Sequence, residues 1–114
     1  MEYVMLMIAP REKLGDQTPQ SVVAAVREYA MRLAASGRLK DGRQLQSDAL
    51  GFRVESDAKA GQVVDGPFAD TKELVGGYFV IECDSLEEAK RLAIENPHRR
   101  IGSVVMVPAV PRRV

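Results

Sequence analysis

The side chains best suited to proton transfer lie in one polar loop, residues 65–73, and at one position far along the chain. Asp65, Lys72 and Glu73 bring two carboxylates and an ammonium group into this loop. His98 is the only histidine, a residue type whose side chain suits a general base or proton shuttle. If folding gathers these four side chains, they form an acid–base site. The structural alternative is a well-made turn, with His98 as an exposed turn residue.

The same loop and the strand after it carry residues suited to contacting a ligand. Phe68 is apolar within a polar loop, and Asp70 adds a third carboxylate. Gly76 and Gly77 permit a bulge or a close backbone approach, and Tyr78 offers a ring with a hydroxyl group. These residues predict a ligand site between the loop and the sheet, because loops on a rigid scaffold often carry function. In the alternative reading, Phe68 only anchors the turn.

The residue inventory argues against a metal or a cofactor. With one histidine and one cysteine, a site built from several such ligands cannot form. The loop carboxylates would hold a cation only if they converged, and their spacing does not require it. No serine has a G-x-S-x-G context, and Gly76-Gly77 lacks the further glycine of a dinucleotide site. We therefore predict no metal and no cofactor, and an inert core thiol at Cys83.

Length and composition indicate one globular domain over residues 1–114, with residues 108–114 as a frayed tail. Sixteen basic residues balance sixteen acidic residues, so no net field attracts nucleic acid or an anionic membrane. No apolar run approaches the roughly 20 residues of a membrane span, and the first residues lack a signal-peptide pattern. With a single cysteine, these features predict a cytoplasmic protein that contacts neither nucleic acid nor membrane.

Apolar periodicity predicts strands and helices along most of the chain. Thr18-Pro19 is expected to open the first helix with Thr18 as its N-cap, and Ser85 to cap the second. Residues 39–50 have no clear pattern. The expected elements are a strand over 2–8, a helix from 19 to 36, a hairpin of 51–56 and 62–65 with its turn at 57–61, a buried strand over 76–83, a helix ending at Asn96-Pro97 and a strand over 101–107.

Several segments in this order resemble one known family. Asp65-Gly66-Pro67-Phe68, followed by Thr71-Lys72-Glu73 and Gly76-Gly77-Tyr78, is similar to the DGPF signature of the YCII-related family. The opening strand, the Ser85 helix with its Asn96-Pro97 turn and the last strand are similar as well. The resemblance implies a ferredoxin-like domain that dimerises, with no settled activity. It also suggests an association with sigma factors of the extracytoplasmic-function type. Some family members suggest a His–Asp pair as an active site, but the first helix here has no histidine.

The element order itself predicts the fold class, α+β with a split βαβ pattern. We expect an antiparallel sheet with two helices on one face, of the dimeric α+β barrel type. Strands 3–8, 78–83 and 103–107 are apolar on both faces, so the second face also needs a cover. A second copy supplies it most simply, which predicts a homodimer with a cleft between the sheets.

Three functions remain open from the sequence. The first is a small binding or regulatory module, with a small-molecule ligand or a protein partner such as a sigma factor. The second is a cofactor-independent acid–base enzyme acting in the dimer cleft. The third is an interaction domain without a ligand.

Overall fold

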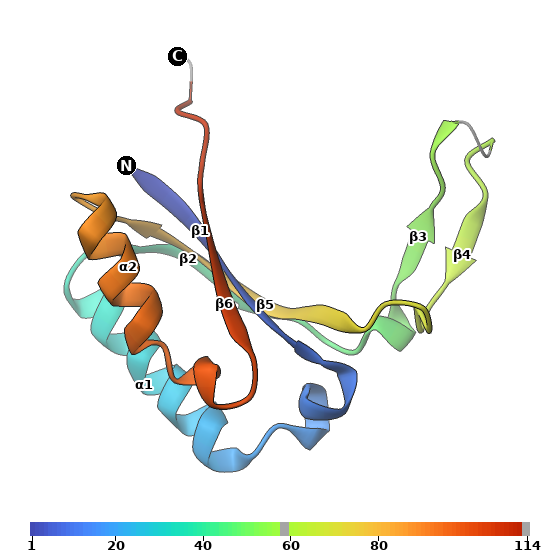
Figure 1. Cartoon of the computed structure of the whole chain (residues 1–114), viewed down its shortest axis with the longest axis horizontal. Helices are drawn as coiled ribbons and strands as arrows, with labels where there is room; N and C mark the ends of the chain where they lie inside the picture. Colours follow the sequence, from blue (N-terminus) through green and yellow to red (C-terminus); the bar gives the residue numbers. More distant parts are fainter. Residues whose placement is uncertain (58–59, 113–114) are drawn as a thin grey trace.

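The computed structural model describes residues 1–57 and 60–112. Its main sheet is antiparallel, with strand order β2-β5-β1-β6, which is the ferredoxin-like order. The predicted α+β architecture is confirmed, and both helices cover the same face of the sheet (Figure 1). The elements are β1 (Glu2–Pro10), α1 (Gln20–Ala35), β2 (Leu39–Gln44), β3 (Phe52–Val54), β4 (Val63–Asp65), β5 (Glu73–Glu82), α2 (Leu86–Glu95) and β6 (Ser103–Pro108), with short 3₁₀ helices at Arg11–Lys13, Gly15–Gln17, Asp48–Leu50 and Pro97–Arg100.

The central strand β1 shows why the sheet has two different faces. Its burial alternates residue by residue, as side chains of a strand point to opposite faces in turn. Tyr3, Met5 and Met7 are buried against the helices. Val4 and Leu6, on the other face, are only half-buried. We call this second surface the open face, and within one protomer nothing among the described residues covers it completely.

The core lies between the sheet and the helices. Tyr29 of α1 joins its parts: its hydroxyl donates to the carbonyl of Leu92 in α2 at 2.6 Å, and its ring centroid lies 6.2 Å from that of Phe79 in β5. Burial raises the pKa of Tyr29 above its ordinary value. Cys83 is also buried here, as predicted, and burial raises the pKa of its thiol.

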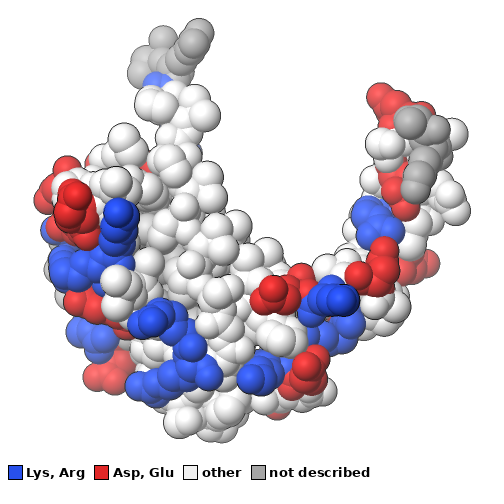
Figure 2. Space-filling view, in the orientation of Figure 1, with Lys and Arg blue, Asp and Glu red and all other residues white. Residues whose placement is uncertain are grey.

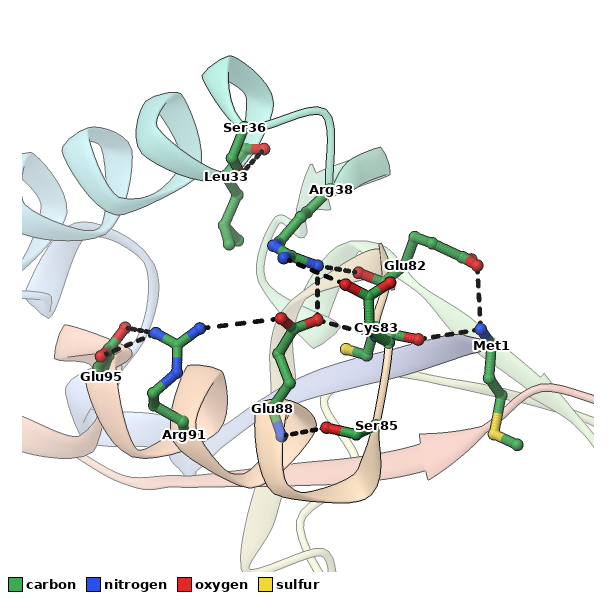
Figure 3. A network of polar contacts seen from close by, with 11 residues as sticks. Met1, Leu33, Ser36, Arg38, Glu82, Cys83, Ser85, Glu88, Arg91 and Glu95 are labelled. Carbon is green, nitrogen blue, oxygen red and sulfur yellow. Dashed lines mark hydrogen bonds and ion pairs between the residues drawn. The ribbon is translucent and has the colours of Figure 1, made fainter.

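The two helix starts differ from each other in how they are capped. Thr18 was predicted as the N-cap of α1, but its hydroxyl donates to the carbonyl of Lys13 and Pro19 takes the cap position. At α2 the prediction is confirmed, because Ser85 Oγ accepts from the N–H of Glu88 at 3.1 Å. The Glu88 carboxylate accepts in turn from the N–H of Asp84 and pairs with Arg38 (Figure 3). This network fixes the start of α2 against the end of α1.

Strands β3 and β4 form a separate two-stranded hairpin, which we call the arm. The arm projects from the body on the side of the sheet opposite the helices (Figure 1). Its apolar side chains are largely exposed: Phe52 is 65% exposed, and Val54 and Val63 are each 57% exposed. The predicted turn at 57–61 includes positions 58 and 59, which lie outside the described residues.

Two further segments refine the predictions. Residues 39–50, which gave no pattern, form β2 and a short 3₁₀ helix. The tail was expected from residue 108, but Pro108 ends β6 and the N–H of Ala109 still donates to the carbonyl of Glu2 at 2.8 Å. The last two residues, 113 and 114, lie outside the described part. None of the described helices is long and apolar enough to cross a membrane.

Candidate functional site

A pocket of about 330 Å³ opens between α1 and the helix-covered face of the sheet. We call it the α1 pocket. Such a volume lies at the small end of the roughly 300–1,000 Å³ typical of ligand sites. Its walls are mainly apolar and come from β1, α1, β2, β5 and the segments before α1 and after α2, with Met7, Leu14, Val22, Val26, Phe79 and Ile101 among them. Five polar residues also line the pocket: Thr18, Arg27, Arg43, Gln44 and His98.

His98 reaches this pocket because the turn after α2 folds back onto the sheet. The Asn96 side chain accepts from the N–H of His98 at 2.9 Å and points its amide at the sulfur of Met5. Asn96 is 1% exposed and His98 is 5% exposed. The alternative reading of His98 as an exposed turn residue is therefore wrong, because a buried asparagine holds the turn inward.

The imidazole of His98 has a defined orientation. Its Nε2 lies 2.9 Å from the carbonyl oxygen of Ile8. A carbonyl oxygen only accepts, so Nε2 carries the proton and neutral His98 keeps its lone pair on Nδ1. Gly102 allows this approach, since a Cβ at that position would stand 3.0 Å from Nε2 and 2.0 Å from the Ile8 oxygen. The wall of the pocket thus contains a base with one nitrogen already engaged.

Arg27 gives the α1 pocket its charge. Arg43 also lines the pocket, but it lies opposite Tyr78 in the β2–β5 pair, so its side chain points to the open face. Among the described residues, the Arg27 guanidinium forms no ion pair and no carboxylate lines the pocket beside it. The pocket therefore combines an apolar interior with one arginine whose charge the described carboxylates leave uncompensated.

The loop at 65–73 is tied down by a contact that the sequence did not reveal. Arg11 donates from Nε and Nη2 to the two carboxylate oxygens of Asp48, at 3.1 and 2.7 Å. Asp48 also accepts from the N–H of Phe68 at 2.9 Å, and Arg11 donates to the carbonyl of Phe68 at 3.0 Å. The hydrogen bond from Arg11, followed by that from Phe68, lowers the pKa of Asp48 to about 2. No spacing signal could find this cluster, because its members lie 20 to 57 residues apart.

Gly66 explains part of the Asp-Gly-Pro-Phe motif. A Cβ on Gly66 would stand 1.8 Å from the backbone oxygen of Asp48, which no side chain tolerates. The N–H of Gly66 donates to the carbonyl of Gly51 at 2.9 Å, and the Gly66–Pro67 peptide bond is cis. The motif thus serves as a close packing joint between the loop and residues 48–51, with Arg53 lying 5.2 Å over the Phe68 ring.

A second hollow, of about 640 Å³, lies beside this joint. We call it the loop pocket. Phe68, Leu74 and Val75 line it from the loop and the start of β5, and Arg11 and Asp48 line it from the opposite side. It occupies the place where the sequence predicted a ligand site, between the loop and the sheet.

The structure distributes the predicted site residues over several places. His98 and Gly77 line the α1 pocket, Phe68 lines the loop pocket, and Gly76 lines both. Gly76 is also the extra residue of a bulge, since β1 pairs Met7 with Gly77 and the next residue with Val75. Four predicted residues are exposed and line neither pocket: Asp65, Asp70, Lys72 and Glu73.

Tyr78 points to the open face, because its neighbours Gly77 and Phe79 face the helices. Its hydroxyl lies 3.4 Å from a carboxylate oxygen of Asp41. Among the described residues, no three histidine, cysteine or acidic side chains lie where they could hold a metal ion together. Within one protomer, the structure therefore keeps Tyr78 and the acidic loop residues apart from His98.

The family model of the YCII-related domain matches residues 1–112. An uncharacterised protein of Rhizobium meliloti (strain 1021), R00369, is 44% identical over 48 residues, which cover 40% of this chain and 39% of that protein. The match thus spans about two fifths of that relative's length.

One solved structure shares the fold over most of its length. It is the 5-chloro-2-hydroxyhydroquinone dehydrochlorinase TftG of Burkholderia phenoliruptrix AC1100, in complex with 2,5-dihydroxybenzoquinone. The TM-score is 0.60 at 16% identity, over 96% of this chain and 94% of that chain. At this identity the likeness shows a common fold.

Proposed function

The chain belongs to the YCII-related domain family, and from that premise we propose that it is a homodimeric domain that binds a small anionic ring compound in the α1 pocket. The observation that carries this proposal is the pocket itself. It joins an apolar interior of about 330 Å³ to Arg27, which no described carboxylate neutralises.

The chemistry of the walls selects the ligand class. Apolar side chains such as Val26 and Phe79 favour a flat hydrocarbon ring. Arg27 favours a carboxylate or an ionised hydroxyl on that ring, because charge-assisted hydrogen bonds to guanidinium are strong. TftG, which shares the fold, holds 2,5-dihydroxybenzoquinone, a single ring with two hydroxyl groups. This supports a ligand of the same size class.

Calorimetric titration tests the proposal, with benzoate and 2,5-dihydroxybenzoquinone as probes. Wild type is expected to bind at least one of them, and Arg27→Gln to weaken its binding about tenfold, the loss of one charge-assisted contact. Arg32→Gln is the matched control, because Arg32 lies on the same helix but does not line the pocket. Equal binding by both variants, or no binding of either probe by wild type, would contradict the proposed site.

The open face supports the dimer. It presents Val75, Val105 and Val107, which are 39, 38 and 48% exposed. The concave side of the molecule, between β6 and the arm, carries little charge, while charged side chains gather over the helices and along the arm (Figure 2). An apolar sheet face of this kind is a common site for pairing with a second copy. The arm, with Phe52 exposed, extends from the same side and would add contact area (Figure 1).

A second candidate function is a cofactor-independent acid–base enzyme, and the orientation of His98 favours it. With Nε2 donating to Ile8, the free Nδ1 of His98 would take a proton from a bound hydroxylated ring. Asp65, Lys72 and Glu73 have no part in this form of the proposal, because they line neither pocket.

The enzyme hypothesis is tested with 5-chloro-2-hydroxyhydroquinone, from which loss of a proton and a chloride ion would give 2-hydroxy-1,4-benzoquinone. His98→Gln keeps an N–H that can donate to Ile8 but lacks the basic nitrogen. Turnover that His98→Gln abolishes, while benzoate binding persists, would support catalysis. Absence of turnover by wild type across pH 5–9 would leave the binding function alone.

A further inference from the structure

The α1 pocket and the loop pocket meet along one wall. A residue that lines two neighbouring hollows lies at their boundary, so the shared residues form the partition between them. They are Leu14, Gly15, Gln44, Leu45 and Gly76. The two hollows are thus adjacent parts of one depression that runs from α1 to the Phe68 loop.

Leu14 is the side chain that stands directly on the sheet at this boundary. A Cβ on Gly76 would lie only 2.6 Å from Cδ2 of Leu14 and 3.6 Å from its Cγ. The leucine therefore occupies the space that a side chain at position 76 would need. The bulge in β5 places a glycine there, and the glycine lets Leu14 divide the depression.

The backbone that carries Leu14 is held at both ends. Upstream, Arg11 is bound to Asp48 and to the carbonyl of Phe68. Downstream, the Thr18 hydroxyl donates to the carbonyl of Lys13 at 2.9 Å. The N–H of Leu14 donates to the carbonyl of Arg11 at 3.1 Å. Shortening the Leu14 side chain removes none of these bonds, so the partition can be opened while the segment stays in place.

We infer that Leu14 determines specificity, because its side chain restricts the site to one-ring anions. Without this side chain, the two pockets would form one elongated site for a two-ring anion. This inference rests on the proposed binding function of the α1 pocket. The anionic group stays with Arg27 in the α1 pocket, and the second ring extends past position 76 toward Phe68. Phe68 and Leu74 line the loop pocket there, and both are apolar residues that suit such a ring.

Calorimetric titration with benzoate and 4-phenylbenzoate tests this inference. Wild type is expected to favour benzoate. Leu14→Ala is expected to bind 4-phenylbenzoate about tenfold more tightly than wild type does, with benzoate affinity changed less than about threefold. Leu50→Ala is the matched control, because Leu50 lines the loop pocket alone and its truncation enlarges that hollow without opening the partition. Its preference for benzoate is expected to equal that of wild type.

The outcomes separate the two claims. If wild type binds benzoate and Leu14→Ala gains nothing for 4-phenylbenzoate, the inference fails and the binding function stands. An equal gain in Leu50→Ala also overturns it, since the gain would come from volume alone. If neither probe binds wild type or Leu14→Ala, both claims fail. Should Leu14→Ala not fold, Leu14→Val makes the same comparison with a smaller expected gain.

Discussion

Substituting Val105→Glu on the open face tests the dimer. Val105 lies on β6, opposite Leu6 of β1, and is 38% exposed in the protomer. Full burial of a valine is worth about 2 kcal/mol, so the part still exposed has less than about 1 kcal/mol to contribute to an interface. The protomer itself should tolerate the glutamate at this half-exposed position.

In a dimer the same glutamate would be costly. An unpaired carboxylate buried in an interface costs several kcal/mol, and a two-fold dimer carries the substitution twice. We expect the dimer to weaken by at least about 4 kcal/mol, roughly a thousandfold in Kd.

Light scattering coupled to size exclusion measures the outcome at micromolar concentration. Wild type should elute as a dimer and Val105→Glu as a folded monomer with an unchanged far-ultraviolet circular dichroism spectrum. Met31→Glu is the matched control: Met31 is 66% exposed on α1, and its variant should remain dimeric. A wild type that is monomeric, or a Val105→Glu variant that stays dimeric, would refute the role assigned to the open face.

Three further predictions concern the joint and the core. Gly66→Ala should lower the free energy of unfolding in urea by about 2–3 kcal/mol, whereas Gly51→Ala, whose Cβ would stand 3.6 Å from its nearest neighbour, should have a much smaller effect. Asp48 has a pKa of about 2 in the fold, below the usual value of about 3.9. The ionised carboxylate therefore contributes fully to the free energy of unfolding above about pH 3.9, and this contribution is lost as the pH falls toward about 2. Asp48→Asn should flatten the dependence of stability on pH between about pH 5 and 2, and an unchanged slope would contradict this. Tyr29→Phe should cost about 1–3 kcal/mol in thermal or urea unfolding, because the carbonyl of Leu92 loses its buried donor; a neutral effect would mean that water replaces it.

The elements of the fold followed from the sequence because their signals are local. Apolar runs marked the strands, and Ser85 with Glu88 marked the start of α2. The first helix was also predicted, but its cap was wrong, because Pro19 takes the cap position and the Thr18 hydroxyl donates to the carbonyl of Lys13. No element could be predicted over residues 39–50, because β2 has mostly polar residues at exposed positions and shows neither a strand period nor a helix period.

The candidate site was predicted only in part, because tertiary contacts decide it. Gly76-Gly77 was predicted to permit a bulge or a close backbone approach, and Gly76 does form a bulge that borders both pockets. The burial of His98 depends on Asn96 reaching Met5 across the core, a contact between residues 91 positions apart. Arg11 and Asp48 meet for the same reason, over 37 positions. The charged residues of the 65–73 loop were predicted as site residues from their type, but residue type alone does not place a side chain in a cavity.

The most direct test of the central claim is a benzoate titration followed by two-dimensional ¹H–¹⁵N NMR. If the ligand occupies the α1 pocket, the largest shift changes will map to its walls, at Val26, Arg27 and Gly77 and in the ring of His98. If they map instead to the open face, around Tyr78 and Val105, the ligand binds on the other side of the sheet and the proposed site is wrong.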